Sequence, residues 1–414
     1  MKHDRAKWVL VFAATATMVV SYIDRQALAV LAPTITRDLG ISDKQFGMLL
    51  SAFSAAYLVG APLAGMFIDS VGARLGLMVS MLVWSAIAGA HALVPGFGAL
   101  LLLRVLLGAA EAPSFPAAAQ TVSRALPPSE RSAGFGLLFT GSSIGAMVAP
   151  LLVARLAASF GWRWAMLTTA VVGLLWLPAW LLITGTKSAR ARMEIPVERR
   201  RMGPRDLLLF DAPVVRAVMV VMATSPVGTF VLNWTSKLLV AAHHVTQRDV
   251  GHYLWLPPLM MDVGAVGFGA LAVARERWSG RDRSPRELLA IGGLCGLALA
   301  TLPLAHTPWQ STALCAVGLA GVGACFALVT AEMLRRVAPS RVAQAGGMTA
   351  AAQSLAYIVA NPLIGWSVDR TGNHLAAAVA CGLWVVPGCL VWLAWPEASA
   401  EIPQRSLDPQ ADEK

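Results

Sequence analysis

The chain has 414 residues, of which 57% belong to the apolar set AVILMFWYC and only 14% are charged. A soluble globular protein carries about 25% charged residues, and one of this length could not bury so much apolar surface in a single core. Intrinsic disorder is excluded as well, because it requires low hydrophobicity and high charge. The composition therefore indicates a protein with many membrane spans.

Twelve stretches are long and apolar enough to cross a membrane, which takes about 20 mostly apolar residues. We expect them at residues 8–33, 45–68, 76–94, 97–121, 132–157, 162–183, 212–240, 250–274, 288–305, 309–334, 342–367 and 375–395. The first follows a basic N-terminus, as a signal peptide does. It continues without a small-residue cleavage site and eleven spans follow, so we expect it to remain as the first helix of an all-α membrane protein.

The basic residues predict the orientation. The chain has 33 Lys and Arg against 23 Asp and Glu, a net charge of +10. If both termini are inside, the inner side holds 24 basic residues, the outer loops hold seven, and Arg25 and Arg104 lie within spans. The positive-inside rule therefore predicts cytoplasmic termini, and the basic excess is expected to face membrane lipid rather than nucleic acid.

A polar stretch at residues 184–211 separates six spans from six. Two six-helix halves joined by a cytoplasmic linker are the layout of the major facilitator transporters. We therefore expect an N-terminal half at residues 1–183, a C-terminal half at residues 212–396 and a cytoplasmic tail at residues 397–414.

Between the second and third spans, residues 65–74 read GMFIDSVGAR. This segment resembles the loop motif of the major facilitator superfamily, Gly-x-x-x-Asp-x-x-Gly-x-Arg. Glycines permit a tight turn, and the carboxylate can accept from a helix N-terminus or from a basic side chain across an inner gate. The residues expected to act in gating are Gly65, Asp69, Gly72 and Arg74. The matching residues 267–275 read GFGALAVAR and lack the Asp, so we expect the first half to latch the gate.

Four ionisable residues lie deep in the predicted spans of the first half, namely Asp24, Arg25, Arg104 and Glu111. Charged side chains there cost about 2.5–3.5 kcal/mol each on insertion scales and mark functional sites. Arg104 and Glu111 are seven residues apart and share a helix face, whereas the neighbours Asp24 and Arg25 point in different directions. The structural alternative is two buried ion pairs that hold the first span against the fourth.

The charges of this cluster suggest coupled binding. Two acids and two arginines sum to zero, so an entering carboxylate adds one negative charge and one proton restores neutrality. Because net charge is costly in a low-dielectric site, the anion and the proton each favour the binding of the other. We expect Arg25 to hold the carboxylate bidentately and Arg104 to balance the acids, and the sequence also allows the reverse assignment.

Further segments narrow the family. They are residues 22–25 (YIDR), 104–113 (RVLLGAAEAP), 141–150 (GSSIGAMVAP) and 160–164 (FGWRW). In this order they resemble the anion:cation symporter branch of the superfamily, and within it the bacterial hexuronate and galactonate transporters. The resemblance covers about residues 20 to 370. It implies a bacterial inner-membrane protein that imports an organic anion with protons, and it implies that Asp24 and Glu111 are the protonation sites.

The resemblance also points to substrate contacts in the first half, at Tyr22, Tyr57 and Ser142. Tyr22 shares a helix face with Arg25, and a buried phenol needs a partner. For Ser142, close helix packing is an equal alternative, because the Gly-x-x-x-Gly pattern at residues 141–145 lets helices approach.

The second half offers further candidates for substrate contact, which are Asn233, Trp234, Trp255, Gln353, Ser354 and Tyr357. Gln353, Tyr357 and Asn361 form an i, i+4, i+8 polar stripe, which suits a face turned toward a cavity. Asn361 precedes Pro362, so it could equally satisfy backbone groups freed at a kink.

Two acids of the second half carry weaker expectations. Asp262 is expected to be a buried carboxylate without an obvious partner, which either contacts the cavity or caps a neighbouring helix. Glu332 lies beside Arg335 and Arg336, and we expect a surface ion pair there.

Several activities lack their motifs. The sequence has no phosphate-binding Gly-x-x-x-x-Gly-Lys-[Ser/Thr] and no Cys or His cluster with metal spacing. Residues 141–145 (GSSIG) match the hydrolase elbow formally, but that elbow requires a strand before it. We therefore expect no enzyme, no catalytic residues, no metal and no cofactor other than protons as the coupling ion.

We predict a monomeric transporter that imports an organic monoanion, a sugar acid such as a hexuronate or an aldonate, with protons by alternating access. The alternatives are an importer of a smaller hydroxy acid or an aromatic carboxylate, a proton-coupled drug exporter, and a transporter-like sensor.

Overall fold

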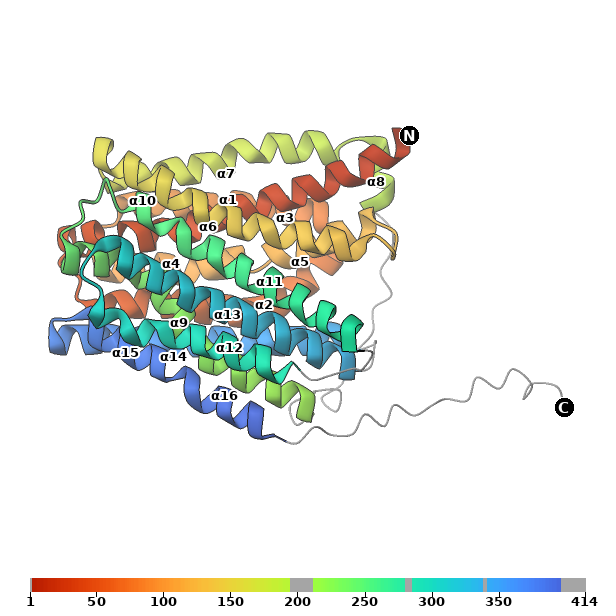
Figure 1. The fold of residues 1–414 in the computed structure, drawn as a ribbon. Coiled ribbons are helices and arrows are strands. Elements are labelled where there is room, and N and C mark those ends of the chain that lie inside the picture. Colours follow the sequence, from red (N-terminus) through yellow and green to blue (C-terminus); the bar gives the residue numbers. More distant parts are fainter. Residues whose placement is uncertain (1, 194–210, 280–284, 338–340, 396–414) are drawn as a thin grey trace.

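The computed structural model describes residues 2–193, 211–279, 285–337 and 341–395, and the regular elements within these ranges are helices that form one bundle (Figure 1). The elements of the first half are α1 (Lys2–Asp38), α2 (Asp43–Val71), α3 (Ala73–Ala90), η1 (His91–Leu93), α4 (Phe97–Glu111), α5 (Ser114–Ala125), α6 (Arg131–Phe160), α7 (Trp162–Thr184) and α8 (Lys187–Met193). Those of the second half are α9 (Ala212–His243), α10 (Gly251–Leu254), α11 (Leu256–Ser279), α12 (Arg286–Leu297), η3 (Ala298–Leu304), α13 (Pro308–Arg336), α14 (Val342–Thr371), α15 (His374–Leu383) and α16 (Val385–Ala394).

The predicted spans correspond to these helices. Within the described ranges, eleven segments are long and apolar enough to cross a membrane. The remaining predicted span, residues 342–367, is occupied by the 30-residue helix α14. The predicted twelve-span, all-α membrane fold is therefore confirmed. Most of the predicted linker (residues 184–211) and the predicted tail (residues 397–414) lie outside the described residues, although α8 falls within the linker.

The fourth span is not the continuous helix that we expected at residues 97–121. It is interrupted after Glu111, where α4 ends, and α5 begins at Ser114. Pro113 lies in the break and has no N–H to donate to a carbonyl one turn earlier, which weakens the helix there. Glu111, the acidic residue of this span, is therefore the last residue of α4.

Local sequence explains where α2 begins and ends. Ser42 and Gln45 form a capping box at its N-terminus, in which each side chain accepts from the backbone N–H of the other. Gly72 ends α2 with a φ angle of 82°, a backbone conformation that residues other than glycine rarely adopt. The predicted turn is therefore made by Gly72 alone. Gly65 lies inside α2, where no turn occurs, so its expected part in the turn was wrong.

The two halves share one hydrophobic core only toward the predicted outer side. That core contains residues of both halves, including Leu31 and Phe46 of the first and Phe230 and Trp234 of the second. Elsewhere each half has a core of its own, which contains Leu10, Ile68 and Val122 in the first half and Val214, Met333 and Trp392 in the second. The end of the bundle that carries the N-terminus, at the right of Figure 1, is therefore the end at which the halves are not joined through a common core.

Candidate functional site

The centre of the first half holds an ion pair between α1 and α4. Nε of Arg25 donates to Oε2 of Glu111 at 2.6 Å, and the Ser21 hydroxyl, one turn earlier on α1, donates to the same oxygen at 3.3 Å. Glu111 is fully buried, whereas the Arg25 side chain keeps 18% of its surface exposed. The pair thus has a fully buried acidic end and a partly exposed basic end.

Aromatic rings surround the Arg25 guanidinium. The Cζ atom of Arg25 lies 4.5 Å from the centroid of the Tyr57 ring, 5.1 Å from that of Tyr22 and 5.2 Å from that of Phe53. Phe53 and Tyr57 are stacked, with an interplanar angle of 21°. Ring faces attract a guanidinium and hold its plane, so these three residues fix the direction in which Arg25 presents its donors.

The second arginine does not pair with Glu111 by a hydrogen bond. The Arg104 side chain is buried, lies 4.5 Å from the Phe53 centroid, and makes one hydrogen bond among the described residues, from Nε to the Leu49 carbonyl at 3.5 Å. Arg25 rather than Arg104 therefore forms the salt bridge to the acid. The sequence favoured Arg104 as the counter-charge of the acids. The salt bridge forms with Arg25 instead, because the two side chains meet across α1 and α4, and the substrate roles of the two arginines stay predictions.

Several polar atoms of this cluster are buried without a hydrogen-bond partner among the described residues. They are Nη2 of Arg25, Oε1 of Glu111 and both carboxylate oxygens of Asp24. Asp24 faces Trp84 of α3 and Thr169 of α7, away from its neighbour Arg25. Unsatisfied buried groups of this kind are costly, and a bound ion or proton would relieve the cost.

The first-half helix α6 packs closely on α1 through Gly141 and Gly145. A side chain at Gly145 would meet the Val19 carbonyl and Tyr22, and one at Gly141 would meet Thr15. Ser142 is partly exposed beside this contact and makes no hydrogen bond to another described residue.

Across α6 from this contact, Asp262 has a partner that the sequence did not reveal. The Ser143 hydroxyl donates to its carboxylate at 2.7 Å. Asp262 is partly exposed. This hydrogen bond joins α6 of the first half to α11 of the second. The sequence offered a cavity contact or a helix cap as the role of Asp262, and neither of them includes this contact between the halves.

The second half has a network of neutral groups centred on Asn361. Its side-chain oxygen accepts from the Thr229 hydroxyl at 2.9 Å and from the Trp234 indole at 3.0 Å, and its amide donates to the Tyr357 carbonyl at 2.9 Å. Asn233 donates to Thr229 at 3.0 Å. The Asn361 amide thus bonds the Tyr357 carbonyl and not that of Ile358, which is the carbonyl that Pro362 leaves open, so its predicted role at a kink is not seen in this structure.

The proline itself supports a contact between the halves. Pro362 cannot donate to the carbonyl of Ile358, four residues earlier on α14. That carbonyl accepts instead from the Ser51 hydroxyl of α2 at 2.8 Å. A carbonyl that the proline leaves open therefore takes part in the contact between the halves.

Other predicted substrate contacts lie apart from this network. The Trp255 indole donates to the His252 carbonyl at the junction of α10 and α11, and the Ser354 hydroxyl donates to its own helix at Ala350. Gln353 is partly exposed and makes no hydrogen bond to another described residue. The Tyr357 hydroxyl lies against Gly228, and Tyr357 is near Tyr22 of the first half.

An ion pair between the buried Lys237 and the partly exposed Asp43 joins the halves at the predicted outer side. Nζ of Lys237 lies 2.6 Å from Oδ1 of Asp43 and donates to the Thr36 hydroxyl at 3.0 Å. The Asp369 carboxylate accepts from the backbone N–H groups of Asp43 and Lys44 at 2.8 and 2.9 Å. These contacts join α9 and α14 of the second half to α1 and α2 of the first, and we call the Lys237–Asp43 pair the outer latch.

Among the described residues, the hydrogen bonds of the predicted gating motif stay within its own half. Asp69 accepts from the Gln120 side-chain amide of α5 at 3.0 Å, and Oε1 of Gln120 accepts from the backbone N–H of Ala73, the first residue of α3. Arg74 donates to Thr184 at 3.2 Å. The contact across an inner gate stays a prediction for another conformation.

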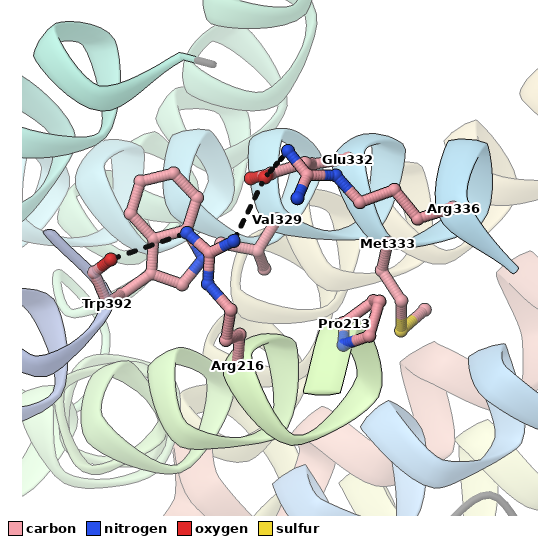
Figure 2. A pocket seen from close by; sticks show the side chains of 7 residues that line it. All are labelled: Pro213, Arg216, Val329, Glu332, Met333, Arg336 and Trp392. Carbon is pink, nitrogen blue, oxygen red and sulfur yellow. Dashed lines mark hydrogen bonds and ion pairs between the residues drawn. The ribbon is translucent and has the colours of Figure 1, made fainter. Parts of the chain in front are cut away.

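Glu332 is not on the surface, as we had expected. It is buried and pairs with Arg336, one turn along α13, at 2.7 Å and with Arg216 of α9 at 3.4 Å (Figure 2). The Arg216 guanidinium also lies over the Trp392 ring and donates to its carbonyl. The expectation was wrong because Arg216, 116 residues away in the chain, buries the acid against α9.

Sequence reasoning missed several residues of the site. Ser21 and Phe53 could have been found, because each lies four residues before a predicted site residue, Arg25 or Tyr57, and so shares its helix face. The outer latch has no such local signal, since its partners lie on helices from different halves.

Comparison with known proteins identifies a family, two similar curated proteins and a solved structure with the same fold. The model of the Major Facilitator Superfamily matches residues 14–358. A hexuronate transporter of Escherichia coli (strain K12) is 27% identical over 93% of both chains. A D-galactonate transporter of Escherichia coli O6:H1 is 25% identical over 90% of this chain and 91% of its own. A crystal structure of a bacterial homolog to the human lysosomal transporter Spinster, inward-facing and unoccupied, shares the fold with a TM-score of 0.79 and 17% identity, over 95% of this chain and 99% of that one.

Proposed function

Because this chain belongs to the major facilitator superfamily, and so is an integral membrane transporter rather than an enzyme, we propose that it imports a sugar acid, such as a hexuronate or an aldonate, together with protons. The observation that carries the proposal is the ion pair between Arg25 and Glu111. It combines a basic group open to an anion with an acid that is fully buried.

Competition for Arg25 would couple the anion to the proton. Nη2 of Arg25 has no hydrogen-bond partner among the described residues, and Nε is engaged by Glu111. A substrate carboxylate that binds both donors must displace Glu111, which would leave a buried negative charge. A proton on Glu111 removes that charge, so each ligand favours the other. Asp24, without a hydrogen bond to its carboxylate, is the second proposed proton acceptor.

Partly exposed hydroxyl and amide groups of the two halves suit a polyhydroxylated anion. Tyr22, Tyr57, Gln353 and Tyr357 are all partly exposed, and they come from both halves. Sugar hydroxyls both donate and accept, so such side chains can hold them without adding charge. The printed functions of the two relatives above, hexuronate and D-galactonate transport, support the choice of a sugar acid.

The proposed orientation places both termini on the cytoplasmic side of a bacterial inner membrane. The basic residues support it, with 24 on that side and seven on the other. The halves are then joined at the outer side and separate toward the cytoplasm, as expected of the conformation that releases an imported substrate. Because the charged cluster lies within one chain, we propose that a monomer is sufficient.

The proposal is tested on purified protein in liposomes with an inward proton gradient. Internal pH is followed while sugar acids, small hydroxy acids, aromatic acids and lipophilic cations are added in turn. Acidification on addition of a sugar acid, absent from protein-free liposomes, is the expected result. Acidification with another class of acid alone, alkalinisation with a cation, or no response to any compound would contradict it.

A further inference from the structure

Asp262 is the one acid of the second half, among the described residues, that lies far inside a span. It is eleven residues from the start of the span Gly251–Trp278, whereas Glu287, Glu332 and Asp369 lie within about one turn of a helix end. Its carboxylate accepts from Ser143 and is partly exposed. A half-buried charge with one neutral partner is costly at this depth, and such residues line substrate pathways.

The position of Asp262 relative to the arginine follows from α6. Gly145 of α6 packs against Tyr22, whose ring lies on the Arg25 guanidinium. Ser143 precedes Gly145 by two residues, which is about 3 Å along the helix axis. Asp262 therefore lies at nearly the same depth in the membrane as Arg25, one helix width away, where the two halves meet.

The charges of the region are balanced except for this acid. Arg25 and Arg104 offset Asp24 and Glu111, so the first-half cluster is neutral when all four are charged. Asp262 adds a negative charge from the second half, across α6 from this cluster. In a low-dielectric region this charge acts over the width of a helix, so direct contact with the ligand is not required.

From this asymmetry we propose that Asp262 determines specificity: it selects monocarboxylates and rejects dicarboxylates of the same carbon skeleton. The inference deepens the proposed function and rests on it. An aldonate or a hexuronate presents a carboxylate to Arg25 and hydroxyl groups elsewhere, and a hydroxyl can donate to the Asp262 carboxylate. An aldarate carries a second carboxylate, which has no proton to donate and is repelled by the same charge.

The test uses three probes with one configuration, namely D-galactonate, D-galacturonate and the dicarboxylate galactarate. Proteoliposomes take up labelled D-galactonate, and the concentrations at which unlabelled galactonate and galactarate inhibit uptake by half are compared. We expect the wild type to prefer galactonate at least tenfold, and galacturonate to compete like galactonate. In Asp262→Asn we expect the preference to fall about tenfold, since the neutral amide removes the repulsion.

Matched variants separate charge from shape and folding. Asp262→Glu keeps the charge and should keep the preference, whereas Asp262→Ser is a second neutral variant and should lose it. Asp249→Asn removes a charge from an exposed outer-loop position of the same half and should leave both uptake and preference within twofold.

Two failures can be told apart. If the wild type takes up no monocarboxylic sugar acid, the proposed function falls and the specificity role falls with it. If the wild type imports galactonate but galactarate competes equally, or if both neutral variants keep the wild-type preference, only the role of Asp262 is overturned.

Discussion

The two halves of the molecule differ in how they use polar groups within the membrane. In the first half, the partly exposed Arg25 pairs with the buried Glu111, and Nη2 of Arg25 has no hydrogen-bond partner among the described residues. In the second half, Thr229, Trp234 and Asn361 bond to one another through neutral groups. A charge with spare hydrogen-bonding capacity can respond to an ion or a proton, whereas a satisfied neutral network holds a shape. The first half is therefore suited to binding and coupling, and the second to positioning and closure.

The largest effect is expected from the arginine that carries the anion. Arg25→Lys keeps the charge but loses the planar fork and the contact with the rings of Tyr22 and Tyr57. We expect affinity for a sugar acid to fall about 100-fold, in line with the loss of a charged, buried contact. Binding is measured by competition for uptake in proteoliposomes.

The matched control is Arg163→Lys, because Arg163 forms an exposed ion pair with Asp38 and should tolerate the exchange within about twofold. Unchanged affinity in Arg25→Lys would move the carboxylate site away from this cluster.

The next effect separates coupling from binding within the first half. Glu111→Gln keeps the shape of the side chain but can neither carry a negative charge nor take up a proton. We expect accumulation driven by a proton gradient to fall at least tenfold, while exchange of internal for external substrate continues. Both are measured with labelled substrate in the same proteoliposomes.

Glu130→Gln is the control for this change, since Glu130 pairs with Lys7 near the end of the bundle and takes no part in the proposed coupling. Accumulation by Glu111→Gln at the wild-type level would show that the proton binds elsewhere.

Much of this division between the halves could be predicted from the sequence. Hydropathy located the spans, because a bilayer imposes a length on every crossing helix. The four buried charges were identifiable as a set, since ionisable residues are rare at that depth. The Gly141 and Gly145 pair predicted a close helix contact, and α6 makes that contact with α1.

The partners of these charges could not be predicted, because they depend on the packing of distant helices. Glu111 and Arg104 share one helix, but the salt bridge forms with Arg25, 86 residues away. Lys237 was counted among the outer basic residues, and the structure buries it against Asp43. Local spacing determines which face a residue occupies and leaves open which helix that face meets.

A smaller effect is expected when the outer latch is broken. Lys237→Met removes the charge that holds Asp43, so the conformation with the outer side closed should lose about 1–2 kcal/mol relative to the outward-open one. Spin labels attached at the exposed positions 37 and 248 should show a new, longer distance. Asp43→Asn should do the same, and the double variant should add little, since both changes remove one interaction.

The neighbouring Lys44 offers the control for the latch, because its side chain is exposed and Lys44→Met should leave the distance distribution unchanged. If both Lys237→Met and Asp43→Asn kept the wild-type distribution, closure would depend on apolar packing alone.

The smallest effect concerns the Ile358 carbonyl of the second half, which lies four residues before Pro362 and accepts a hydrogen bond from the first half. Ser51→Ala removes the donor to the Ile358 carbonyl, and Pro362 cannot replace it, so we expect the closed conformation to lose about 1 kcal/mol. The label distances above measure this shift, and Ser54→Ala is the control because Ser54 bonds only within its own helix, to Leu50. Adding Pro362→Ala to Ser51→Ala supplies an N–H to the same carbonyl and should reduce the loss. If the second change left the loss unaltered, the Ser51 hydroxyl would act through packing and not through the carbonyl that the proline leaves open.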